Sequence, residues 1–174
     1  MKRFSQFNEA FDSSYKFNGK KVSNDEYSYG FDSEYTDPKG KTKKSRVQVD
    51  IVGSENANDE DHYIWDIGFS RRLTPDMTAG KMIIPGQPSY GMTGDGDGLK
   101  IFSTVMKIAQ EFVNKEDPKY VSFAAEKPKG APSKAMATRE KLYLRMSKKY
   151  FGKKFKITVK SSATGSVFYL DKKK

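Results

Sequence analysis

Three stretches in the first half of the chain alternate apolar residues with polar or small ones, and this period of two constrains the fold more than any other feature. Successive side chains of a strand point to opposite faces, so each stretch predicts a strand with one buried face. Residues 37–44 and 53–61, which separate the stretches, have the glycine and polar composition of exposed hairpin loops. We therefore expect an antiparallel meander. The alternating apolar residues are Tyr27, Tyr29 and Phe31, then Val47, Val49 and Ile51, then Tyr63, Trp65, Ile67 and Phe69.

The second half of the chain changes to a helical period. Residues 99–114 carry one broad apolar stripe, and a second amphipathic helix is predicted from Ser133, a capping residue, to about Tyr150. Residues 120–125 are continuously apolar or small, the pattern of a strand covered on both faces. Residues 155–159 and 167–170 predict two final strands. The helical apolar positions are Ile101, Phe102, Val105, Ile108, Ala109, Phe112 and Val113, then Leu142, Tyr143, Met146 and Tyr150.

These periods predict an α+β fold, with a central mixed, largely antiparallel and twisted sheet flanked by helices. We expect a single domain over residues 1–174. Residues 1–72 would hold a short N-terminal helix, near Phe4 to Phe11, and the meander. Residues 73–98 would form a long loop that ends in a glycine-rich turn, and loops of this length in compact domains are usually functional or mobile. Residues 99–174 would follow in the order helix, strand, helix, strand, strand.

Composition excludes several classes of protein. The 174 residues include no cysteine and one histidine, so neither a disulfide framework, a cysteine zinc site nor a His-based triad is expected. His62 stands in a polar turn and is predicted to be a solvated loop residue. No segment approaches the roughly 20 apolar residues of a membrane span, and no apolar region follows the basic N-terminus. We expect a cytoplasmic protein that does not bind a membrane.

Positive charge is concentrated in the C-terminal third. Residues 115–174 hold 17 Lys and Arg against 5 Asp and Glu, whereas residues 1–114 hold 15 against 17. The formal net charge of +10 therefore belongs to the C-terminal third, which suits a polyanion such as nucleic acid, a phosphorylated cofactor or an acidic protein surface. The alternative is a solvated lysine face. Lysine outnumbers arginine, the usual residue for reading bases, so sequence-specific recognition is not expected.

The run from Thr93 to Gly98 opens the helix predicted over residues 99–114. Its three glycines, Gly94, Gly96 and Gly98, allow the backbone to approach a ligand closely, and the free N–H groups of a helix start attract phosphate. Asp95 and Asp97 leave two other interpretations open, because these side chains can cap the helix or bind a hard cation. We predict no metal site, and keep a plain capping loop and a phosphate cradle as alternatives.

The order of these elements resembles that of the GNAT superfamily of N-acetyltransferases. In that family a glycine motif between the fourth strand and the next helix binds the pyrophosphate of acetyl-CoA. The resemblance places this role on Thr93, Gly94, Asp95, Gly96, Asp97 and Gly98. A later helix of the family commonly carries a Leu-Tyr pair whose Tyr protonates the departing thiolate. Leu142 and Tyr143 stand where that pair would fall, with Tyr150, Phe151 and Gly152 at the end of the helix.

Residues 60–170 also resemble a set of small bacteriophage-encoded proteins of unassigned function. The resemblance rests on residues 93–98, 101–105, 121–125 and 139–143. It implies a viral protein in the host cytoplasm.

Two functions follow from these resemblances and from the charge. The first is an acyl-CoA-dependent N-acyltransferase that uses acetyl-CoA and an amine acceptor, which would be a protein or a small molecule. Tyr143 would be its general acid, and Asp66 or Glu126 its general base. The second is a non-catalytic viral accessory or structural protein that binds nucleic acid or a host or virion protein through the basic C-terminal third. In that case Asp95 and Asp97 would serve only as helix caps.

Overall fold

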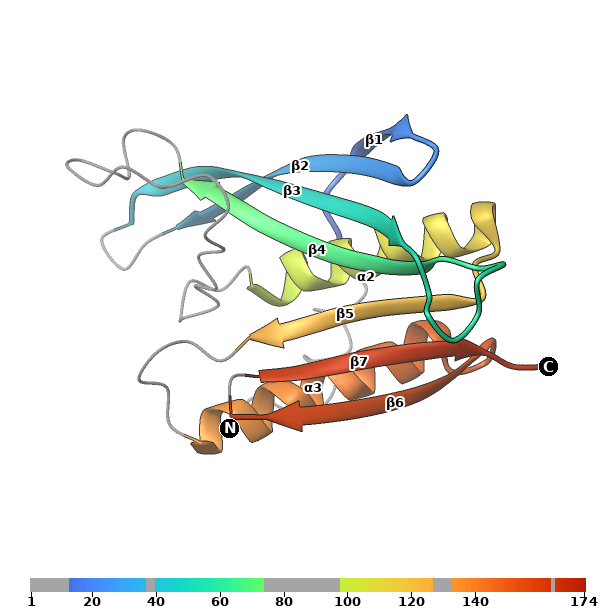
Figure 1. The fold of residues 1–174 in the computed structure, drawn as a ribbon. Coiled ribbons are helices and arrows are strands. Elements are labelled where there is room, and N and C mark those ends of the chain that lie inside the picture. Colours follow the sequence, from blue (N-terminus) through green and yellow to red (C-terminus); the bar gives the residue numbers. More distant parts are fainter. Residues whose placement is uncertain (1–12, 37–39, 74–97, 127–132, 164) are drawn as a thin grey trace. The chain divides into compact units, whose positions relative to one another are not determined.

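The computed structural model describes residues 13–36, 40–73, 98–126, 133–163 and 165–174. These residues form a seven-stranded sheet in the order β1-β2-β3-β4-β5-β7-β6, together with two helices, and the fold class is α+β as expected. The sheet is mixed, because β4 and β5 are parallel while β7 is antiparallel to both β5 and β6. The elements are β1 (Asn18–Ser23), β2 (Glu26–Thr36), β3 (Thr42–Ser54), β4 (Ile64–Leu73), α2 (Gly98–Glu116), β5 (Tyr120–Glu126), α3 (Ser133–Phe151), β6 (Phe155–Ser162) and β7 (Gly165–Lys172), labelled in Figure 1.

The chain divides into two compact units, each of which is described by itself. The first unit comprises Met1–Val22, Tyr27–Asp50 and Phe69–Ile108. The second unit comprises Ser23–Glu26, Ile51–Gly68 and Ala109–Lys174. The organisation into one domain stays a prediction.

The core of the first unit confirms the alternation in β2 and β3. In this unit Tyr27, Tyr29 and Phe31 of β2 and Val47 and Val49 of β3 are buried, and the chain continues this pattern with a buried pair of hydroxyls, Ser33 Oγ and Ser45 Oγ, 2.6 Å apart. A hydroxyl inside an apolar core needs such a partner. The segment before β1 is fastened to α2, since the backbone N–H of Tyr15 donates to Thr104 Oγ1 at 2.9 Å. The ring of Tyr15 stacks on Phe31 with centroids 5.7 Å apart.

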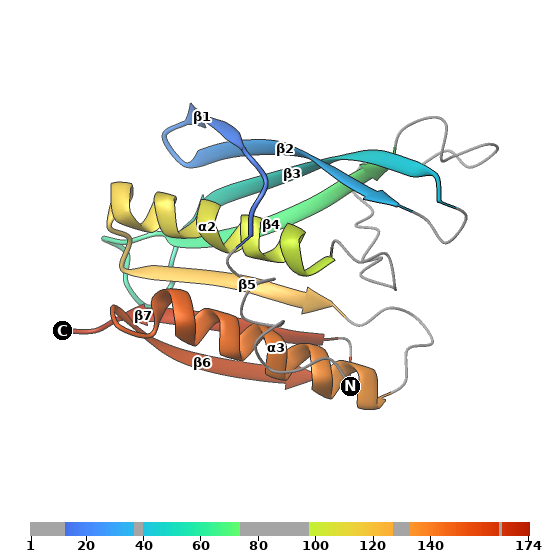
Figure 2. The same cartoon turned by 180° about the vertical axis from the view of Figure 1, so that it is seen from behind.

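The core of the second unit lies between α3 and the strands β5, β7 and β6. Phe123 of β5 and Phe168 of β7 are register partners, and their rings stack with centroids 4.7 Å apart and planes within 4°. Tyr143 and Met146 of α3 are buried, and the ring of Tyr143 lies 6.1 Å from that of Phe168. Figure 2 shows α3 running along the face of β6 and β7. Of the four apolar positions predicted for α3, Tyr143 and Met146 are therefore buried in this core, whereas Leu142 and Tyr150 are half-buried.

Three expectations about local structure were wrong or incomplete. Strand β1 was not predicted, because all six of its residues are exposed and no apolar alternation marks it. Strand β5 is covered on both faces only in part, since Ser122 is buried on the face that leaves Ala124 exposed, while Val121, Phe123 and Ala125 are buried on the other face. The first helix continues two residues beyond its predicted end, to Glu116. The predicted N-terminal helix and most of the long loop, residues 74–92, lie outside the described residues.

Candidate functional site

The glycine run falls at the boundary of the described chain. Thr93, Gly94, Asp95, Gly96 and Asp97 lie outside the described residues, and Gly98 is the first residue of α2. The predicted helix start directly after the glycines is therefore confirmed. The first turn of α2 holds no acidic side chain, so no carboxylate in that turn offsets the partial positive charge of the helix start.

Strands β4 and β5 are parallel neighbours joined through α2. Their register pairs Ile64 with Tyr120, Trp65 with Val121 and Asp66 with Ser122. Parallel strands need a crossover connection, usually a helix, and the loop that follows the carboxyl end of such a strand commonly binds ligands in α/β folds. The glycine run follows the carboxyl end of β4 and precedes the crossover helix. This placement in the topology fits a binding loop.

Asp66, one of the two predicted bases, lies exposed on β4. Its carboxylate accepts a hydrogen bond from Ser122 Oγ of β5 and a longer one, 3.4 Å, from Ser54 Oγ of β3. Because paired residues of neighbouring strands share a face, Asp66 and Ser122 lie on the same face of the second unit's sheet. Two hydroxyls thus fix the orientation of this carboxylate.

Tyr143, the predicted acid, lies on the opposite face. Phe123 follows Ser122 in β5 and therefore points to the other side of the sheet, where it stacks on Phe168 beneath the Tyr143 ring. Tyr143 is 4% exposed. The structure does not bring Asp66 and Tyr143 together, so they cannot serve one reaction as base and acid.

Glu126, the other predicted base, is the last residue of β5, where it pairs with Gly165 of β7. Its side chain lies outside the described part of the chain.

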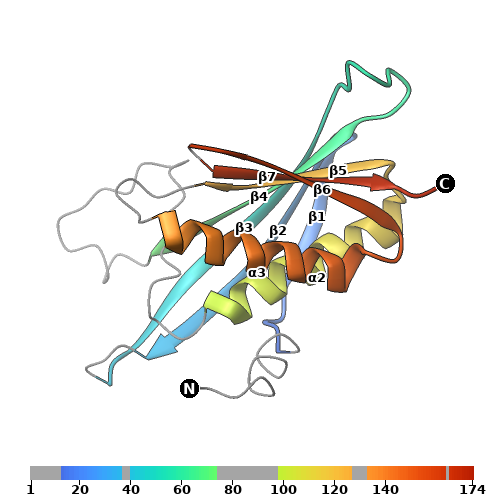
Figure 3. The same ribbon diagram turned by 90° about the horizontal axis from the view of Figure 1, so that it is seen from below.

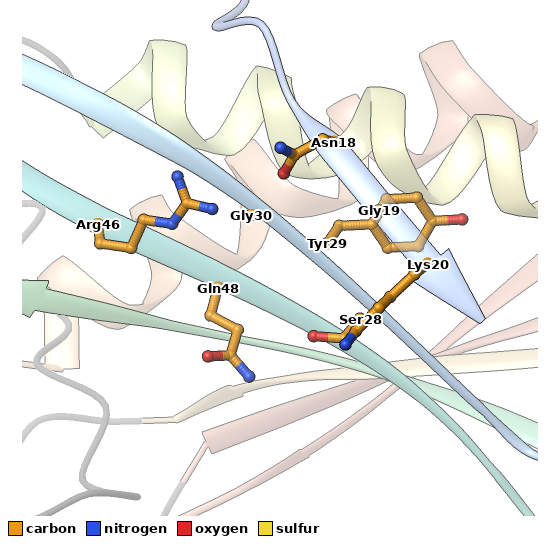
Figure 4. Close-up of a pocket in the computed structure, with 8 residues that line it drawn as sticks. All are labelled: Asn18, Gly19, Lys20, Ser28, Tyr29, Gly30, Arg46 and Gln48. Carbon is orange, nitrogen blue, oxygen red and sulfur yellow. The ribbon is translucent and has the colours of Figure 1, made fainter. Parts of the chain in front are cut away.

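A hollow of about 390 Å³ opens over β1, β2 and β3 of the first unit (Figure 4). Asn18 and Lys20 border it from β1, while Arg46 and Gln48 border it from β3. Gly30 of β2 leaves room for the guanidinium, because a Cβ at this position would lie 2.5 Å from Arg46 Nη2. Cationic and amide groups are those that recognise carboxylates and phosphates. Sequence reasoning did not find this hollow, because its polar residues follow the ordinary outward pattern of strands.

A second hollow, of about 600 Å³, lies in the second unit between β3 and β4 along the chain. Acidic side chains border it, among them Glu55, Glu60 and Asp61, together with His62. A ligand with a positively charged amine would complement these acidic side chains. The hollow precedes β4, however, whereas the glycine run follows the other end of that strand, so the topology does not link the two.

Asp59 lies in the loop between β3 and β4, and its side chain joins this loop to the start of β5. Its carboxylate accepts hydrogen bonds from Lys119 Nζ at 2.5 Å, from the Tyr120 hydroxyl at 2.9 Å and from His62 Nδ1 at 2.9 Å. The hydrogen bond from Lys119, followed by those from His62 and Tyr120, holds the pKa of Asp59 well below its ordinary value. His62, expected to be a solvated loop residue, is exposed and takes part in this structural cluster. The sixty-residue separation along the chain hid the cluster from sequence reasoning.

Replacing Asp59 with Asn should loosen this loop in a pH-dependent way. The folded pKa lies below the unfolded value of 3.8, so the ionised carboxylate stabilises the fold fully above about pH 4 and progressively less as the pH falls further. The difference in melting temperature between wild type and Asp59→Asn should therefore be constant from about pH 7 to pH 9 and shrink below about pH 4. Thermal melts monitored by circular dichroism measure it. A difference in melting temperature that stays the same on acidification would contradict a stabilising role of the Asp59 carboxylate.

A second carboxylate joins α3 to the hairpin of β6 and β7. Glu140 accepts hydrogen bonds from Ser161 Oγ, at 2.6 Å, and from Ser166 Oγ. These two bonds, in that order, lower the pKa of Glu140. The contacts position the hairpin against the helix.

No known protein family, curated protein or solved structure matches the chain. Neither described helix has the length and apolar character needed to cross a membrane.

Proposed function

We propose that the chain is an acyl-CoA-dependent N-acyltransferase of the GNAT type, in which the loop from Thr93 to Gly98 binds the cofactor's pyrophosphate. One observation carries this proposal. The glycine run stands immediately before α2, in the crossover that joins the parallel strands β4 and β5. The succession of β2, β3, β4, α2, β5, α3, β6 and β7 supports it, because the GNAT resemblance implies this order of elements.

The start of α2 has the properties that a pyrophosphate site needs. The N–H groups of the first helical turn have no partner within the helix, and the helix dipole favours an anion there. Gly98 begins the helix, and its first turn carries no acidic residue. The proposal requires that Asp95 and Asp97, which lie outside the described residues, keep their carboxylates away from the phosphates, since like charges repel.

The proposed reaction is direct transfer of the acyl group. The nitrogen of a neutral amine attacks the thioester carbonyl carbon, a C–N bond forms, and the C–S bond breaks. Tyr143 gives its hydroxyl proton to the departing thiolate, while the nitrogen loses a proton to water, from which the tyrosinate is reprotonated. Asp66 is left out of this step because it lies on the face opposite Tyr143.

Binding of the cofactor can be tested by thermal shift with CoA and acetyl-CoA on wild type, Gly96→Glu and Asn24→Glu. Asn24 is exposed in the turn after β1, so Asn24→Glu adds the same charge at a position far from the glycine run along the chain. Ligand at a hundredfold excess over its Kd stabilises the native state by about 2.7 kcal/mol. We expect a rise in melting temperature for wild type and Asn24→Glu that persists at high salt, and none for Gly96→Glu. No rise in wild type would reject the proposal.

A further inference from the structure

Lysines from three separate parts of the second unit gather at one end of it. They come from the last turn of α2 and the turn that follows it, from the segment between the last turn of α3 and the start of β6, and from the C-terminal end of β7. Figure 3 shows these three segments at the same end, next to the C-terminus. We call this surface the basic end. Its lysines are Lys115, Lys119, Lys148, Lys149, Lys153, Lys154, Lys156, Lys172, Lys173 and Lys174.

Backbone hydrogen bonds join the three segments. The N–H of Lys172 donates to the carbonyl of Lys119 at 2.9 Å, and the N–H of Lys173 donates to the carbonyl of Lys154 at 2.9 Å. Phe155 and Lys172 are register partners in the pair of β6 and β7. The lysines are therefore held together by the fold itself, and they do not owe their proximity to one flexible tail.

Much of the positive charge at this end stays uncompensated. Lys154 Nζ donates to the amide oxygen of Asn114 at 2.9 Å, and Lys173 Nζ donates to the carbonyl of Gly152 at 2.6 Å, so both are oriented by neutral oxygens. Three lysines of this end pair with carboxylates: Lys115 with Glu116, Lys119 with Asp59 and Lys172 with Asp117. Asp171 stands near the end of β7, and the loop of Asp59 also carries Glu60 and Asp61. Ten lysines against these six carboxylates leave a formal surplus of four positive charges.

The chemistry of this surface favours nucleic acid over a membrane. The exposed large hydrophobic residues of the described chain are Val22, Val52 and Tyr63, and only Tyr63 adjoins the basic end, since Ile64 pairs with Tyr120 next to Lys119. A surface that binds lipid usually inserts an apolar face as well as presenting charge. Nucleic acid instead offers a regular row of phosphates that lysines neutralise as point charges, with release of counterions.

We propose that the basic end binds the phosphate backbone of nucleic acid without reading its sequence. This site is separate from the glycine run and does not depend on the proposed acyltransferase activity. Binding should weaken linearly with the logarithm of salt concentration, with a slope of about −0.9 per phosphate contact on duplex DNA and about −0.7 on single strands. Oligonucleotides of unrelated sequence should bind alike.

Fluorescence anisotropy with labelled duplex and single-stranded oligonucleotides tests the proposal across several salt concentrations. The test variant combines Lys148→Gln, Lys153→Gln and Lys174→Gln, which replace exposed lysines of the basic end. The control variant combines Lys16→Gln, Lys20→Gln and Lys21→Gln, which remove the same charge from exposed positions of the first unit. Circular dichroism verifies that both variants fold.

We expect the test variant to bind more weakly to every oligonucleotide and to lose about one from the salt slope for each lysine that contacts phosphate. The control variant should keep most of the wild-type affinity and slope. An equal loss of affinity in both variants would mean that binding depends only on the net charge of the protein, and this result would overturn the proposal. Equally tight binding of poly-glutamate at the same salt would also overturn it, because the surface would then fit acidic proteins.

Discussion

Replacing Phe168 with Ala is expected to lower the free energy of unfolding by about 3–5 kcal/mol. Phe168 is fully buried, stacks on Phe123 with centroids 4.7 Å apart, and contacts the ring of Tyr143 from α3. Removing it leaves a cavity at the point where β5, β7 and α3 meet. Proteins of ordinary stability unfold at a cost of about 5–15 kcal/mol, so this loss is a large fraction of the total.

Urea unfolding followed by circular dichroism measures the effect, with Phe168→Leu as the milder comparison. Leucine keeps most of the apolar volume, so it should cost clearly less than alanine. A loss below about 1 kcal/mol for Phe168→Ala would mean that the stack is not part of the core.

The proposed acyltransferase mechanism predicts that replacing Tyr143 with Phe reduces acyl transfer by about 10²–10⁴-fold while leaving the fold intact, because a general acid contributes on this scale. The substitution keeps the ring that packs beside Phe168 and removes only the hydroxyl. Loss of one hydrogen bond usually costs about 0.5–1.5 kcal/mol of stability, which is small beside the cost of Phe168→Ala. Single-turnover kinetics at saturating acetyl-CoA separates the chemical step from binding.

Asp66→Asn is the matched comparison for this experiment. Asp66 lies on the opposite face of the second unit's sheet, so its replacement should leave the rate of the chemical step nearly unchanged. Full activity of Tyr143→Phe would show that Tyr143, which is 4% exposed, is a core residue alone.

Hydrophobic period predicted the strands and helices that bury a face. Val47 and Val49 in β3, and Phe102 and Phe112 in α2, are buried as their spacing requires. Strand β1 escaped prediction because none of its residues is buried. Its Gly19 lies against the ring of Tyr29 in β2, and such a contact between two strands leaves no pattern in the sequence of β1. Hydrophobic periodicity therefore identifies elements that bury a face in the core, and it misses strands held mainly by their pairing with a neighbouring strand.

The candidate site was less predictable than the fold. Asp66 and Tyr143 each have a residue type and a location that suit catalysis, but their separation onto two faces depends on the register of β4, β5 and β7. The cluster around Asp59 and Lys119 likewise depends on strand order. Neither property is encoded in a local pattern, because pairing partners lie far apart along the chain.

The most direct test of the acyltransferase proposal is a titration of isotope-labelled protein with acetyl-CoA, followed by amide chemical shifts in NMR spectra. The proposal predicts saturable shifts at Gly94, Gly96 and Gly98 and in the first turn of α2, unchanged when the lysines of the basic end are replaced. Shifts confined to the basic end, or no shifts at saturating ligand, would contradict it.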